Sequence, residues 1–115
     1  MSNPLEVLLR LSEVIADRRR NRPANSYTTR LFDGGTPQIG AKVLEEAAEL
    51  VDAAGRGGAS QVVHETADLL YHILVLLAAS DVTLVQVAEE LERRFGTSGL
   101  DEKDRRAGTV RGTVQ

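Results

Sequence analysis

The sequence predicts an all-α domain of about four helices. Apolar residues recur at three- and four-residue steps in several segments, which is the spacing of one helix face. Glycine and proline gather between these segments, and no segment shows a strong strand pattern. The 115 residues suit one domain, which we place at residues 1–96. Residues 97–115 offer almost nothing to bury, so we expect them to form a mobile tail.

Composition excludes several classes of function. The chain contains no cysteine, which rules out disulfides and thiolate metal sites and suits a reducing compartment. A net charge of −3 and an aromatic content of 3% argue against nucleic-acid binding. The longest apolar run, Leu69–Ala79, includes a histidine and is too short to span a bilayer. We therefore expect a soluble cytoplasmic protein without a membrane or nucleic-acid partner.

The first helix is predicted to begin at Asn3-Pro4, where an N-cap residue precedes a proline suited to the first helical position. It should end before Pro23. Its last turn is rich in arginine: Arg18, Arg19, Arg20 and Arg22. These cations either stabilise the C-terminus of the helix or, for one or two of them, reach an anionic substrate.

Residues 23–40 are expected to form a long loop, because Asp33-Gly34-Gly35-Thr36-Pro37 is a dense turn signal. A loop of this length is often a lid or a binding loop. It carries hydroxyls and a charge suited to phosphate oxygens, on Ser26, Thr28, Thr29 and Arg30. The alternative is a loop that only connects two helices.

Two longer helices should follow this loop and pack as antiparallel neighbours. The first spans about residues 37–54 and ends at the glycine-rich residues 55–58. The second, which Ser60 can cap, spans about residues 60–79, and the short connection makes the pair antiparallel. Thr83 and Gln86 fit a capping box for a final amphipathic helix, which Gly96 would stop.

Five carboxylates are predicted to converge between these two helices. At about 100° per residue, Glu45, Glu46 and Glu49 fall on one arc of the first helix. Glu65 and Asp68 lie one turn apart near the start of the second helix, which is apolar all round beyond them and therefore should be buried. Ionised carboxylates at such a position need a partner, and hard oxygen ligands suit Mg²⁺. The alternative for the three glutamates is a solvated surface.

Several motifs together resemble one enzyme family. Ser26-Tyr27-Thr28 and Leu31-Phe32 precede Lys42-Val43-x-Glu45-Glu46-x-x-Glu49 and then Glu65-x-x-Asp68-Leu69-Leu70-Tyr71-His72. Over roughly residues 5–96 this pattern resembles phosphoribosyl-ATP pyrophosphatase, one of the all-α nucleotide pyrophosphohydrolases that include MazG-like proteins and dimeric dUTPases. Leu44 departs from the pattern, since many relatives carry glycine there; the leucine adds bulk but removes no ligand.

The resemblance implies a MazG-like helical bundle, completed by dimerisation, that uses Mg²⁺. The implied reaction is hydrolysis of phosphoribosyl-ATP to phosphoribosyl-AMP and pyrophosphate, the second step of histidine biosynthesis. The metal ligands and water activators would be Glu45, Glu46, Glu49, Glu65 and Asp68, with Lys42 as a phosphate contact and the segment containing Ser26, Tyr27, Thr28 and Arg30 next to the substrate. Four short helices also cannot enclose the apolar helix on every side, which independently favours a homodimer.

Some roles stay open at this point. The general base is expected among Glu45, Glu46 and Glu49. His72 either orients a metal ligand or is a satisfied interior histidine. Three other functions compete: a MazG-like housekeeping hydrolase of nucleoside triphosphates, a di-metal redox bundle, and a helical interaction module. The redox bundle is disfavoured because its Glu-x-x-His pairs are not matched here.

Overall fold

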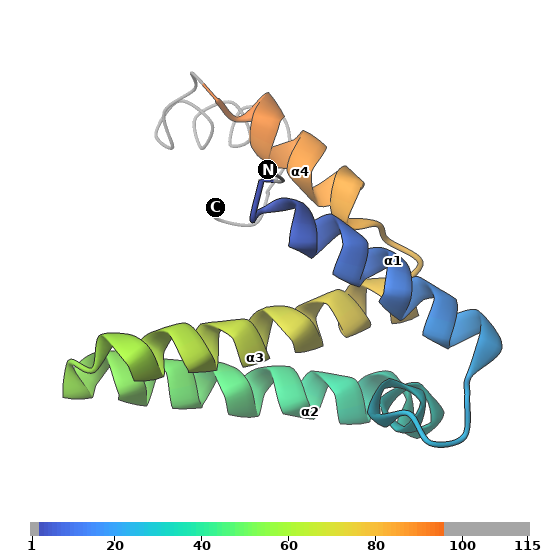
Figure 1. Ribbon diagram of the computed structural model, residues 1–115, viewed down its shortest axis with the longest axis horizontal. Coiled ribbons are helices and arrows are strands. Elements are labelled where there is room, and N and C mark those ends of the chain that lie inside the picture. The colour runs from blue at the N-terminus through green and yellow to red at the C-terminus, as the bar shows by residue number, and fades with distance from the viewer. Residues whose placement is uncertain (1–2, 96–115) are drawn as a thin grey trace, which may run out of the picture. The chain divides into compact units, whose positions relative to one another are not determined.

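The structure is a computed structural model and describes residues 3–95. These residues form four helices and no strand, which confirms the all-α prediction (Figure 1). The helices are α1 (Glu6–Asn21), α2 (Tyr27–Arg56), α3 (Ala59–Ala79) and α4 (Leu84–Arg93). The predicted tail and the predicted stop at Gly96 lie outside the described residues.

Helix α1 begins at Glu6, two residues after the predicted first helical position, and Leu5 rather than Asn3 occupies its N-cap position. The backbone N–H of Leu5 donates to Asn3 Oδ1 at 3.0 Å, so Asn3 satisfies one of the free amides at the start of the helix. The helix ends at Asn21, ahead of Pro23. Ile15 is its fully buried residue and joins the core of the first three helices.

Two of the four arginines near the end of α1, Arg19 and Arg22, pair with groups outside this helix. Arg19 donates to the carbonyl oxygen of Ala78 at 2.6 Å and pairs with the carboxylate of Asp81. Arg22 pairs with Asp33 Oδ1 at 3.0 Å. Arg19 therefore ties α1 to the C-terminal end of α3, where a cation is favourably placed against the free carbonyls.

The predicted loop over residues 23–40 is wrong, because α2 already begins at Tyr27. Ser26 caps it, accepting a hydrogen bond from the backbone N–H of Thr29 at 3.2 Å. The turn signal produces a single non-helical residue, Gly35, with φ 84° and ψ 172°. Only glycine adopts that φ readily. Pro37 then lies in the first turn after the kink, where its missing N–H costs little.

Core packing explains why this segment is helical. Leu31 and Phe32 are buried in one cluster with Ile15 of α1 and Val75 of α3. A helix beginning at Tyr27 places both side chains on the face that meets α1 and α3. Burying a side chain of this size contributes about 1.5–3 kcal/mol, which outweighs the local preference of the glycines for a turn.

Helices α2 and α3 are antiparallel and lie side by side (Figure 1). Gly57, with φ 81°, ends α2 in the left-handed conformation, as predicted for this glycine-rich turn. The predicted Ser60 cap is wrong: Gly58 occupies the N-cap position of α3 and makes no side-chain cap bond. The C-terminal half of α2 thus runs beside the N-terminal half of α3.

A single chain does not bury α3 on every side, as expected for a bundle of four short helices. Val63 of α3 is 69% exposed, and Leu44 of α2 is 74% exposed. By length and composition α3 could also cross a bilayer, with a mean hydropathy of 1.4, although the run Leu69–Ala79 alone is too short. Core helices of soluble proteins meet the same two criteria, so this observation alone is weak evidence for a membrane span.

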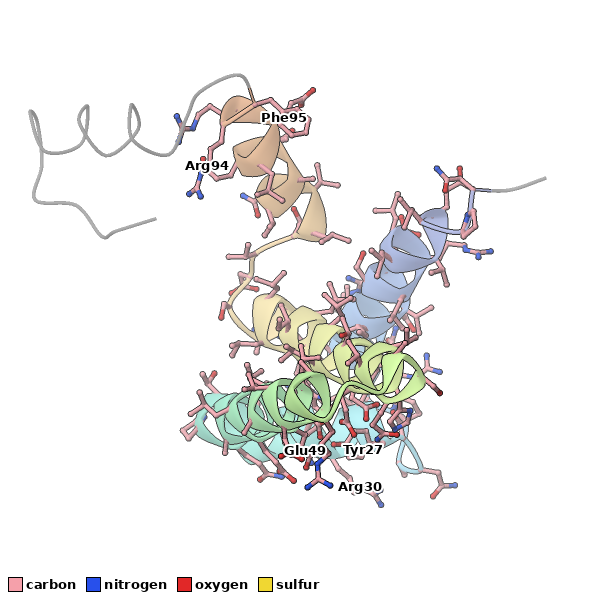
Figure 2. All side chains as sticks on the ribbon, turned by 90° about the vertical axis from the view of Figure 1, so that its left-hand side faces the viewer. Tyr27, Arg30, Glu49, Arg94 and Phe95 are labelled. Carbon is pink, nitrogen blue, oxygen red and sulfur yellow. The ribbon has the colours of Figure 1, made fainter. Side chains whose placement is uncertain are left out.

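Helix α4, apart from its first residue Leu84, belongs to a second unit that begins at Val85. It starts directly after Thr83, as predicted. Its polar side carries Glu90, which pairs with Arg93 at 2.7 Å and with Arg94 at 2.9 Å. Figure 2 labels Arg94 and Phe95 at the end of this helix. The division of the sequence at residue 96 stays a prediction.

Candidate active site

Helices α2 and α3 bring the five predicted carboxylates together. Glu45, Glu46 and Glu49 each offer one oxygen to a group whose atoms lie within 4.8 Å of one another. Glu46, Glu65 and Asp68 form a second such group, which joins the two helices. Glu46 belongs to both, so it is the centre of the acidic cluster. Each group is compact enough for its oxygens to bind a single cation.

The centre of the acidic cluster lacks hydrogen-bond donors. Glu46 is only 7% exposed, and its Oε1 atom is buried without a hydrogen-bond partner among residues 3–95. Glu65 Oε1 is buried without a partner in the same way. An unpaired buried carboxylate oxygen is costly. These two atoms, on facing helices, fit the oxygen ligands of a divalent cation such as Mg²⁺.

In the described part of the chain, Lys42 is the lysine that pairs with the acidic cluster, from one turn before it on α2. Its Nζ lies 3.2 Å from Glu45 Oε1 and 3.6 Å from Glu46 Oε2. The hydrogen bond to Glu45 raises the pKa of Lys42, so the amine stays charged. One ammonium cannot neutralise five carboxylates, and it contacts only the two at its own end.

Glu49 shows the remaining repulsion. The charge of Glu46 raises the pKa of Glu49, with smaller contributions from desolvation and from Glu65. On α3, Gln61 Nε2 donates to Glu65 Oε2 at 2.9 Å. His64 Nε2 lies 3.4 Å from Asp68 Oδ2. These neighbours hold the outer oxygens of Glu65 and Asp68 and leave the buried Glu65 Oε1 without a donor.

His72 is a buried residue beside the acidic cluster, and both of its ring nitrogens have hydrogen-bond partners. Its Nδ1 lies 2.8 Å from the backbone carbonyl of Asp68, which can only accept, so Nδ1 carries the proton. Its Nε2 then accepts from the hydroxyl of Tyr27 at 2.9 Å. Burial raises the pKa of Tyr27, which keeps that hydroxyl protonated. Both ring nitrogens of His72 are therefore hydrogen-bonded. Through these bonds His72 links the helical turn of α3 that contains Asp68 to the start of α2.

The predicted substrate-facing residues differ in accessibility. Ser26 is occupied as a cap, and Thr28 is buried with its hydroxyl bonded to that of Tyr71. Tyr27 and Arg30 are exposed, with the guanidinium carbon of Arg30 6.0 Å from the ring centroid of Tyr27. In Figure 2 both labelled side chains lie in the same part of the view as Glu49. The start of α2 therefore carries an exposed cation, Arg30, while the hydroxyl of Tyr27 already donates to His72.

A groove of about 480 Å³ borders the acidic cluster on its other side. It lies between the C-terminal half of α2 and the N-terminal half of α3, and it shares Glu49 and Glu65 with the cluster. The other lining residues are Ala48, Asp52, Ala53, Arg56 and Gln61. The sequence prediction missed Asp52, Arg56 and Gln61. Spacing was the available signal, because Asp52 and Gln61 each lie one helical turn from a predicted ligand.

Comparisons with known proteins point to one family. The sequence model of that family, phosphoribosyl-ATP pyrophosphohydrolase, matches residues 8–95. A phosphoribosyl-ATP pyrophosphatase of Erythrobacter litoralis is 50% identical over 102 residues, which cover 89% of this chain and 98% of that protein. Relatives with the same name from Trichlorobacter lovleyi and Dechloromonas aromatica are 49% and 46% identical. The matches cover 90% and 85% of this chain, and 95% and 91% of those proteins.

Proposed function

This chain belongs to the phosphoribosyl-ATP pyrophosphohydrolase family, and from that premise we propose that its acidic cluster holds Mg²⁺ for the cleavage of phosphoribosyl-ATP. The protein is a hydrolase of histidine biosynthesis. Its substrates are phosphoribosyl-ATP and water, and its products are phosphoribosyl-AMP and pyrophosphate.

The observation that carries the metal proposal is the pair of unsatisfied buried oxygens on Glu46 and Glu65. The ligands of Mg²⁺ would be Glu45, Glu46, Glu49, Glu65 and Asp68. When bound, the metal supplies charge neutralisation for the triphosphate and a water of lowered pKa. The alternative for the three glutamates was a solvated surface. It does not account for the burial of Glu46 at the centre of the acidic cluster.

Among the carboxylates, Glu49 is our candidate for the general base. It is exposed to water, and its pKa is raised by Glu46, which makes it a stronger proton acceptor than an ordinary carboxylate. Lys42 and Arg30 are the cations on the opposite side of the acidic cluster from the groove. We assign these two cations to the triphosphate. Ser26 and Thr28 would act on the substrate indirectly, by shaping the start of α2.

We also propose that two chains form a homodimer in the cytoplasm. The apolar side chains of Leu44, Val51, Val63 and Leu70 are exposed on the two helices that carry the acidic cluster. A second copy of the same surface would remove them from water. A solution mass equal to one chain at micromolar concentration would contradict this part of the proposal.

A substrate panel tests the activity. Pyrophosphate release from phosphoribosyl-ATP, ATP and other nucleoside triphosphates should be measured with and without Mg²⁺. We expect phosphoribosyl-ATP to be preferred and turnover to need the metal. Equal rates on all triphosphates would favour the MazG-like housekeeping alternative, and Mg²⁺-independent turnover would remove the metal assignment.

A further inference from the structure

One stripe of α2 carries a cation at each end and carboxylates between them. Lys42, Glu49 and Arg56 are spaced by seven residues, so they project from nearly the same side of the helix. The kink at Gly35 lies before this stretch, and the helix is regular from there to Arg56. At 1.5 Å per residue, the backbone positions of Lys42 and Arg56 are about 21 Å apart along the axis, with Glu49 midway.

The groove beyond Glu49 is unsuited to a polyphosphate. Among residues 3–95 it is lined by three carboxylates and the amide of Gln61, with Arg56 as the one cation. Carboxylate and amide oxygens accept hydrogen bonds, so they match sugar hydroxyls and amino groups rather than phosphate. The small side chains of Ala48 and Ala53 leave room for rings between the two helices. The groove therefore matches the nucleoside part of a nucleotide.

Arg56 has binding capacity left. Its Nε pairs with Asp52 Oδ2 at 2.9 Å, and both side chains are mostly exposed, so this ion pair is weak. Among residues 3–95 its two terminal nitrogens make no hydrogen bond. A guanidinium with two free nitrogens binds the oxygens of a phosphate in the bidentate manner that lysine cannot reproduce.

We propose that Arg56 binds the single phosphate of the phosphoribosyl group and thereby selects phosphoribosyl-ATP over ATP. The inference rests on the proposed function of the acidic cluster. Phosphoribosyl-ATP has a triphosphate at one end, a single phosphate at the other and the purine between. The triphosphate lies at the Lys42 end, the reacting phosphates at the acidic cluster, and the purine and second ribose in the groove. ATP lacks the group that reaches Arg56.

The test compares kcat/KM for phosphoribosyl-ATP with the inhibition constant of ATP against it. Hydrolysis of phosphoribosyl-ATP by the unsubstituted protein is measured first. If it does not occur, the proposed function is wrong, and this is known before any variant is compared. In Arg56→Gln, kcat/KM for phosphoribosyl-ATP should fall on the order of tenfold or more, and the preference over ATP should fall by the same factor. Arg56→Lys should recover part of the loss, because lysine restores the positive charge but cannot donate two parallel hydrogen bonds to one phosphate.

Two further variants make the result specific. Lys42→Gln should weaken the binding of phosphoribosyl-ATP and of ATP by similar factors, since both nucleotides carry the triphosphate. Arg10→Gln removes an exposed arginine of α1 and controls for net charge. An Arg56→Gln variant that weakens both nucleotides equally would place the triphosphate in the groove and overturn the proposal. An unchanged preference would overturn it as well.

Discussion

Two glutamates of this chain lie in opposite electrostatic environments. Glu90 of α4 accepts from Arg93 and Arg94, which lower its pKa to about 2. Glu49 of α2 has carboxylates as its charged neighbours, and its pKa is raised. Both environments come from the same helical spacing of three and four residues, with arginines at the neighbouring positions in one case and glutamates in the other.

The comparison shows two kinds of carboxylate. The charge of Glu90 is balanced by arginines of the chain, whereas the carboxylates of the acidic cluster lack enough cations and donors and so suit a bound ligand. Glu90 is satisfied by the two arginines that follow it, Arg93 and Arg94. The acidic cluster keeps two buried oxygens without donors and has Lys42 at one end only. A protein that retains this arrangement gives up stability in the metal-free state, which is expected where carboxylates are preorganised for a cation.

The largest expected effect comes from removing the centre of the acidic cluster. Glu46→Gln should lower kcat/KM by a factor corresponding to several kcal/mol of transition-state stabilisation. The same substitution should raise the melting temperature of the metal-free protein, because it removes a buried and poorly neutralised charge. Enzyme assays and thermal melts in a chelator measure the two effects.

The matched control is Glu89→Gln on α4, which removes an exposed glutamate outside the acidic cluster. It should change neither quantity appreciably. Comparable losses of activity in both variants would show that net charge, and not the acidic cluster, governs the reaction.

The next effect is the response of stability to the metal. If the acidic cluster binds Mg²⁺, the ion stabilises the folded chain by about 2.7 kcal/mol at a hundredfold excess over its Kd. The melting temperature of the unsubstituted protein should therefore rise with Mg²⁺, and that of Glu46→Gln should rise much less. Potassium chloride at equal ionic strength controls for screening. Identical shifts in both proteins would exclude a bound ion at the acidic cluster.

The sequence predicted that the carboxylates lie together, but it did not predict that α2 begins at Tyr27. The two outcomes differ because the first depends on local helical spacing and the second on contacts between distant residues. Glu46, Glu49, Glu65 and Asp68 sit at helical spacing in two clearly periodic segments, so their convergence follows from an antiparallel pair. The segment before Gly35 contains strong turn residues, and its helicity depends on burying Leu31 and Phe32 against Ile15 and Val75. Contacts between distant parts of the chain override local preference there, and one sequence without its fold does not display them.

The groove was missed for a related reason. Arg56 stands in a glycine-rich run that marks a helix end, and nothing local distinguishes a surface arginine from one that lines a groove. Its role depends on Gln61 and Glu65, which the turn at Gly57 brings back beside α2. The same holds for the bond between Tyr27 and His72, whose partners are 45 residues apart.

A smaller effect concerns pH and Glu49. Its folded pKa lies above the unfolded value of about 4.5, so in that window the folded state binds more protons than the unfolded state. The metal-free protein should therefore gain stability as pH falls from 7 toward the raised pKa. Glu49→Gln should be more stable than the unsubstituted protein at pH 7, and the gap should close on acidification. Melts in a chelator across this range measure it; a gap that widens would contradict the repulsion.

The smallest effect belongs to Glu90, and its sign is opposite. Its folded pKa of about 2 lies below the unfolded value of 4.5, so its contribution to stability is fully present above 4.5 and is lost as pH falls toward 2. Glu90→Gln should thus be slightly less stable than the unsubstituted protein at pH 7, with kcat/KM unchanged. The pairs are exposed, so 0.5 M salt should shrink the difference further. If Glu90→Gln instead stabilised the chain at pH 7, the carboxylate of α4 would be as poorly satisfied as those of the acidic cluster, and the contrast between the two sites would disappear.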